Sequence, residues 1–133
     1  MSQLITAEDK LKERIKELSC LYTISSHISN CDLDNLEPTL QAIALSLNEA
    51  IRFPKEASVE LTVADFHIEV GQQSEDKVFM LSAIKEFNIA IGSIKVGYSK
   101  SKFNENSFLN EEKRLLAKIA LELGNLFERK QII

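Results

Sequence analysis

Apolar side chains recur at helical spacing near the start of the chain. Between Ala7 and Ser29, apolar residues return every three or four positions, which places them along one side of a helix. Charged residues fill the other side as far as Glu17, and such a narrow stripe is typical of a coiled-coil seam. Thr6, with Asp9 three residues later, is predicted to cap this helix. The stripe consists of Leu11, Ile15, Leu18 and Tyr22.

Two further segments share the helical period. The first is predicted to start at Asp34 as N-cap, with Pro38 in its first turn. It should end near residues 52–53, because Pro54 disfavours helix at the residue before it. The last helix is predicted to begin at Asn110 and to run to the end of the sequence. Its apolar stripe contains Leu116, Ile119, Leu123 and Leu126.

The middle of the chain follows the two-residue period of strands. Residues 58–63 and 66–70 alternate apolar and polar side chains around a predicted tight turn at Ala64-Asp65. Residues 78–84 are nearly all apolar, which predicts a central strand covered on both faces. A long fourth strand is predicted over residues 89–98. The strand connections are short, so we expect antiparallel neighbours.

This order of elements predicts an α+β fold: a small antiparallel sheet of about four strands, two N-terminal helices and one C-terminal helix. A chain of 133 residues fits one domain, so we expect a single domain over residues 1–133. Residues 1–18 and 124–133 are expected to protrude as signalling or dimerisation helices. Because the last helical pattern continues to the final residues, we also expect the sequence to be cut from a longer chain.

Composition narrows the classes of function. The chain is 44% hydrophobic and 27% charged, which is typical of a globular rather than a disordered protein. Its net charge of −4 gives no general attraction for nucleic acid, so we expect no nucleic-acid partner. No apolar run approaches the roughly 20 residues of a membrane span, and no signal peptide is recognised. We therefore expect a cytoplasmic location.

Reactive residues are few and scattered. Cys20, His27 and Cys31 would share one stripe if the first helix continued, and could then bind zinc. Because Asn30 is predicted to end that helix and no fourth ligand is evident, we predict neither a metal site nor a cofactor. Inert structural thiols are favoured over a redox sensor. His67 is interpreted as a solvated strand histidine, and no catalytic residue is predicted.

Several segments resemble GAF domains. Residues 91–98 resemble the last long strand of these domains, and residues 108–116 resemble the entry into their closing helix. Residues 12–18 and 21–25 are similar to the signalling helix that leads into GAF domains of bacterial and archaeal sensor kinases, and residues 40–44 to the helix that follows. The resemblance implies a GAF/PAS-like fold and a sensory or regulatory role, often dimeric and coupled to a kinase, cyclase or transcription output.

The sequence departs from that family between the second and third predicted strands. Only residues 71–76 separate them, whereas a full GAF domain places long pocket-forming segments there. A reduced, four-stranded version is implied, and the ligand-binding residues stay unknown.

We therefore expect a non-catalytic sensory domain, of the kind that lies N-terminal in histidine kinases of two-component systems. It would form a homodimer through the two helical stripes and pass signals as changes in helix packing. The same stripes could instead form the core of one chain. The expected partners are a C-terminal kinase or other effector and an unknown small molecule. The alternative is a structural protein–protein interaction module without a small-molecule ligand.

Overall fold

The computed structural model describes residues 6–72 and 76–132 and has the predicted α+β fold. Three helices and a four-stranded antiparallel sheet make up this part of the chain, with a short 3₁₀ turn at Glu105–Ser107. The elements are α1 (Ala7–Ser29), α2 (Glu37–Ala50), β1 (Ala57–Val63), β2 (Phe66–Gly71), β3 (Lys77–Glu86), β4 (Ile89–Ser99) and α3 (Asn110–Ile132).

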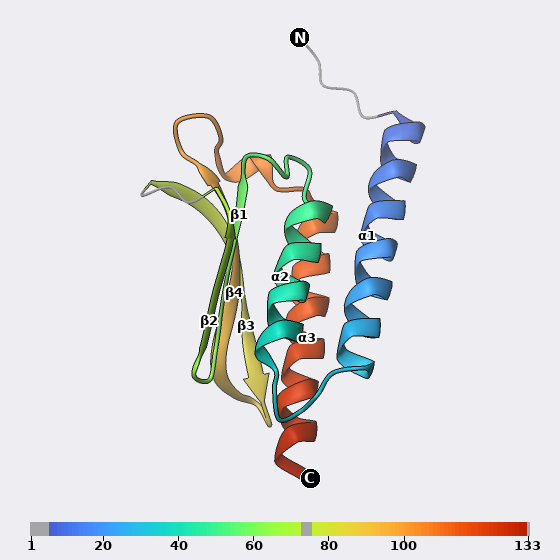
Figure 1. The fold of residues 1–133 in the computed structure, drawn as a ribbon. Helices are drawn as coiled ribbons and strands as arrows, with labels where there is room; N and C mark the ends of the chain where they lie inside the picture. Colours follow the sequence, from blue (N-terminus) through green and yellow to red (C-terminus); the bar gives the residue numbers. More distant parts are fainter. Residues whose placement is uncertain (1–5, 73–75, 133) are drawn as a thin grey trace.

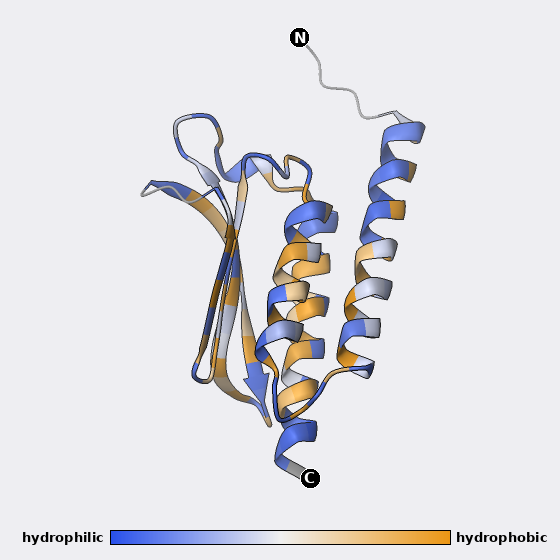
Figure 2. Cartoon of the chain, in the orientation of Figure 1, coloured by the Kyte–Doolittle hydropathy of each residue, from blue (hydrophilic) through white to orange (hydrophobic). Residues whose placement is uncertain are grey.

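Three layers stack in one direction. The sheet forms the first, α2 and α3 cover one of its faces, and α1 packs on the far side of those two helices (Figure 1). Apolar residues gather on the sides of α2 and α3 that look toward the sheet (Figure 2). The sheet contributes to this core Val59, Leu61, Val63, Ile94, Val96 and Tyr98. The two covering helices contribute Leu40, Ile43, Leu47, Leu116, Ile119 and Leu123.

The strand order is β2-β1-β4-β3, and every neighbouring pair is antiparallel. The turn at Ala64-Asp65 joins β1 to β2 as predicted, and Phe87-Asn88 joins β3 to β4. Phe87 and Asn88 have φ angles of 48° and 68°, because a two-residue hairpin whose twist matches its strands needs positive φ. Both hairpins therefore fix their registers locally.

The prediction of residues 78–84 as a central strand covered on both faces is wrong. β3 lies at the edge of the sheet, and Phe79 and Leu81 on its outer side are exposed. The apolar run indicated burial, but only alternate residues such as Met80 and Ile84 enter the core. Phe79 and Leu81 thus form a small exposed apolar patch on the outer face of β3.

The cap predicted from the sequence is confirmed for α1 and is wrong for α2. Thr6 caps α1 as predicted: its hydroxyl accepts from the Asp9 N–H, and the Asp9 carboxylate accepts from the Thr6 N–H. The prediction of Asp34 as a cap is wrong, because the cap position of α2 is Leu36. The Asp34 N–H instead donates to the Asp32 carboxylate in a local turn.

The ends of the two terminal helices pack differently. Leu126 and Phe127 are buried and the Lys130 ammonium donates to the Leu33 carbonyl, so α3 does not protrude over residues 124–130. In α1 the residues before Glu13 are exposed. Residues 1–5 and 133 of the predicted protruding segments lie outside the described residues. Within residues 6–72 and 76–132, none of the helices combines the length and apolar composition that a membrane span requires.

Candidate functional site

Two surfaces of the domain could carry function: the outer face of the sheet and the outer side of α1. Within the described residues no helix lies against the outer sheet face (Figure 1). Paired strand positions bring polar and apolar side chains together on this face. They include Ser58, Glu60, Thr62, His67, Glu69, Phe79, Leu81 and Lys95.

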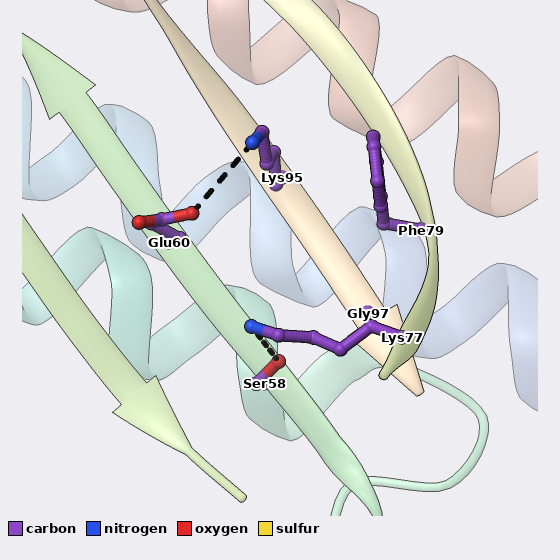
Figure 3. Close-up of a pocket in the computed structure, with 6 residues that line it drawn as sticks. All are labelled: Ser58, Glu60, Lys77, Phe79, Lys95 and Gly97. Carbon is purple, nitrogen blue, oxygen red and sulfur yellow. Dashed lines mark hydrogen bonds and ion pairs between the residues drawn. The ribbon is translucent and has the colours of Figure 1, made fainter. Parts of the chain in front are cut away.

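A shallow hollow of about 150 Å³ lies across β1, β4 and β3 on this face (Figure 3). It exists because Gly97 has no side chain there: a Cβ at this position would lie 2.9 Å from Cδ of Lys77. The Lys77 ammonium donates to the Ser58 hydroxyl at 3.4 Å. The remaining lining residues are Glu60, Phe79 and Lys95.

Both lysines of the hollow have partners already. Besides the bond from Lys77, the Lys95 ammonium lies 3.9 Å from Glu60 Oε1 and 5.0 Å from the centre of the Phe79 ring. An anion entering the hollow would have to replace these contacts. Because both ammonium groups already interact with protein atoms, the hollow is not arranged as an anion-binding site.

Beside the hollow, three side chains of types that can ligate a metal converge from β1 and β2: Glu60, His67 and Glu69. Nε2 of His67 lies 2.9 Å from Glu69 Oε1 and 3.5 Å from Glu60 Oε2. Nδ1 of the same ring lies 2.9 Å from the Thr62 hydroxyl. Within residues 6–72 and 76–132, this is the one group of three or more His, Cys, Asp and Glu ligand atoms lying within 4.8 Å of one another.

His67 is exposed on the polar side of β2, as the sequence predicted. Its two glutamate neighbours were not anticipated. The usable signal was the tight turn at residues 64–65, which sets Thr62 opposite His67 and Glu60 opposite Glu69 in the hairpin.

The second surface is the predicted stripe of α1. All four of its side chains are exposed in the single chain: Leu11 by 59%, Ile15 by 53%, Leu18 by 53% and Tyr22 by 78%. The helix packs on α2 and α3 through a different side, on which Glu17, Cys20 and Ile24 are buried. The stripe thus has no partner within the described part of its own chain.

The other half of the predicted dimer interface lies elsewhere. The stripe of α3 is fully buried between that helix and the sheet, so it belongs to the core of its own chain and not to an intermolecular seam. The physical reason is that the sheet needs an apolar cover, and α3 supplies it. The residues concerned are Leu116, Ile119, Leu123 and Leu126.

A groove of about 490 Å³ runs between the start of α1 and the start of α3. Leu11 and Arg14 line it from α1, and Leu109 and Arg114 line it from the other side. The groove continues the exposed apolar surface of α1 toward α3, so a partner helix could contact both.

The cysteines and His27 do not form a site. Cys20 is buried, its thiol donates to the Ser46 carbonyl, and burial raises its pKa to about 12. Cys31 lies beyond the end of α1 and its sulfur accepts from Arg129. Burial and the raised pKa both disfavour the thiolate near neutral pH, which agrees with the expected structural thiol.

One buried carboxylate joins separate segments. Glu112 near the start of α3 accepts from the Leu109 N–H at 2.8 Å and from the Arg52 N–H at 2.7 Å. Burial raises the pKa of Glu112, and these two hydrogen bonds oppose that rise. Both carboxylate oxygens accept from backbone donors, so Glu112 joins the start of α3 to the segment after α2.

Comparison of the sequence with protein-family models and with curated proteins finds no match. The GAF resemblance accordingly stays a hypothesis.

Proposed function

We propose that this chain is a non-catalytic, GAF-like regulatory domain of signal transduction that works as a homodimer through α1. The observation that carries the proposal is the exposed stripe of that helix, Leu11, Ile15, Leu18 and Tyr22. An apolar row along a charged helix is stabilised when a second helix covers it.

A second copy of the chain is the partner that fits the stripe best. The steps of four, three and four residues are those of a heptad seam, which pairs with a helix of the same spacing. A twofold axis brings identical faces together, so the second copy supplies this spacing without any further requirement.

The neighbouring part of α3 would extend such an interface. Leu121 is exposed and lies one turn from Lys118, whose ammonium is 4.0 Å from Glu17 of α1. Dimer contacts would thus involve an exposed leucine of α3 in place of its buried stripe.

A regulatory role is supported by the small number of buried side chains in α1. Of its 23 residues only three side chains are buried, and one of these is a carboxylate. A helix that buries so few side chains can change its packing at modest free-energy cost, which suits a two-state signalling element. The output partner would be a kinase or another effector.

A second candidate function is a plain protein–protein interaction module that binds no small molecule. The sheet face favours it, because the hollow of Figure 3, at about 150 Å³, is below the roughly 300–1,000 Å³ of common ligand pockets. The groove of about 490 Å³ between α1 and α3 falls within that range, so it is the place where a small molecule would bind if the sensory function holds. A thermal-shift screen of nucleotides and metabolites separates the two candidates, since a specific ligand raises the melting temperature.

The dimer is tested with Leu18→Glu and a matched control, Leu45→Glu, which changes a similarly exposed leucine on α2. We expect light scattering to give the mass of a dimer for the unchanged chain and for Leu45→Glu, and that of a monomer for Leu18→Glu. A charge in the centre of an apolar seam would have to be buried without a partner.

Circular dichroism should show the same fold for all three proteins, because both leucines are exposed in the single chain. A monomeric unchanged chain at the same concentration would contradict the proposal. Equal dissociation of both variants would also count against α1 as the seam.

A further inference from the structure

We propose that Glu60, His67 and Glu69 form a binding site for one divalent transition-metal ion of the zinc class. The three side chains project from two paired strands on the outer face of the sheet. This site is independent of the proposed dimer, because it lies on the opposite side of the molecule from α1 (Figure 1).

The spacing of the ligand atoms suits such an ion. Nitrogen and oxygen ligands at about 2.0–2.2 Å from zinc in a tetrahedral site are separated by about 3.3–3.6 Å. The two distances from Nε2 of His67, 2.9 Å to Glu69 Oε1 and 3.5 Å to Glu60 Oε2, require only small side-chain rotations.

The hydroxyl of Thr62 orients the imidazole. It lies 2.9 Å from Nδ1 of His67: in the tautomer whose Nδ1–H donates to this hydroxyl, the lone pair of Nε2 faces the two carboxylates, and in the other tautomer Nε2–H donates to Glu69 Oε1. A cation bound by the cluster would select the first of these tautomers, because it needs the lone pair of Nε2. A hydrogen-bond acceptor behind the ring nitrogen is also the usual support of metal-ligating histidines.

The backbone holds the donors in place. Glu60 is the direct cross-strand partner of Glu69, and Thr62 is that of His67, so the register of the hairpin fixes all four positions. Ligands on paired strands keep their geometry better than ligands on loops. The Lys95 ammonium faces Glu60 Oε1, the oxygen turned away from His67, and thereby leaves Oε2 to the ion.

The donor set selects the class of ion. An imidazole nitrogen with two carboxylates suits zinc and neighbouring transition metals, whereas calcium and magnesium prefer oxygen ligands alone. Because His67 and Glu69 are exposed, a fourth position stays open to water or to an anionic ligand.

The test uses the full chain without an affinity tag, titrated with zinc by calorimetry and with Co²⁺ by visible absorption. We expect one equivalent to bind. His67→Ala and Glu69→Gln should each weaken binding by at least about tenfold. His27→Ala, which removes the other histidine of the chain, should leave the affinity for zinc unchanged. Excess Mg²⁺ should not compete.

His67 and Glu69 are both exposed, so the circular dichroism spectra and melting temperatures of the two variants should match those of the unchanged chain. If His67→Ala is unstable, Glu69→Gln alone tests the site. The proposal is overturned if no ion binds, or if His67→Ala and Glu69→Gln bind as tightly as the unchanged chain. A thiolate-to-cobalt charge-transfer band would assign the ion to Cys20 or Cys31 and overturn it as well.

Discussion

The two terminal helices, α1 and α3, have the same length of 23 residues and similar apolar spacing, yet they bury different faces. The apolar stripe of α3 covers the sheet and forms much of the core. The stripe of α1 faces away from the domain, and the helix is attached through other residues, Cys20 and Ile24 among them. The same apolar spacing therefore predicts that each helix has an apolar face, but it does not predict which part of the protein covers that face.

The width of the apolar face distinguishes the two helices. Beside its central row, α3 also buries Leu115, Ala120 and Phe127, which gives the broad face expected of a helix on a globular core. The stripe of α1 is a single narrow row, bordered by charged residues as far as Glu17. A narrow row suits contact with one other helix, and a broad face suits contact with a sheet.

The same substitution in both helices gives the largest expected difference. Leu123→Ala in α3 should lower the free energy of unfolding by about 2–5 kcal/mol, because a fully buried side chain is lost and a cavity remains. Leu18→Ala in α1 should change it by about 0.5 kcal/mol or less, since that leucine is half exposed.

Urea unfolding measures both values, at concentrations where light scattering finds only monomer. Comparable losses for the two variants would mean that α1 is buried in its own chain as deeply as α3, and the contrast between the helices would fail.

A smaller effect of opposite sign is expected at the contact between the two helices. Glu17 of α1 is buried, its Oε2 has no hydrogen-bond partner among the described residues, and its Oε1 lies 4.0 Å from the partly exposed Lys118. Glu17→Leu should raise the free energy of unfolding by about 1 kcal/mol, because it removes a poorly compensated buried charge.

Urea unfolding again provides the measurement, with Glu13→Leu, one turn earlier and less buried, as control. A loss of stability in Glu17→Leu would show that the pair with Lys118 compensates the charge fully.

The smallest effect is a dependence on pH at the start of α3. Burial raises the pKa of Glu112 above its ordinary value of 4.5, so the folded state holds this proton more tightly than the unfolded state. The stability that this proton contributes is complete below the ordinary value and is lost as pH rises through the raised pKa.

Glu112→Gln removes that dependence while keeping an oxygen that can accept from one backbone N–H. The stability advantage of the unchanged chain over this variant should therefore decrease as pH rises above the ordinary value of 4.5. Urea unfolding at several pH values tests it, and an advantage that grew with pH would contradict the raised pKa.

The sequence predicted the elements of the fold well, because each has a local signal. The periods of the strands and helices, the turn at Ala64-Asp65 and the cap at Thr6 all depend on residues close in the chain. The place of β3 in the sheet was predicted wrongly, because strand order depends on pairing between distant segments. An apolar run such as residues 78–84 does not reveal whether one or both faces are covered.

The candidate sites could be predicted only in part for the same reason. His67 was placed correctly on a polar strand face, and the hairpin register that adds Glu60 and Glu69 was available in principle. The hollow beside them needs Gly97 and Lys77 from two further strands, whose alignment has no local signature.

The three layers determine how a structural change on the outer face of the sheet could be transmitted to α1. Helix α1 rests on α2 and α3, which themselves rest on the sheet (Figure 1). A change at β1 or β2 can therefore reach α1 through the two intervening helices, or through the connection before β1, where the Ile51 carbonyl accepts from Lys16 of α1. Because α1 buries few side chains, it is the element that can open as a separate unit while the other two layers stay folded.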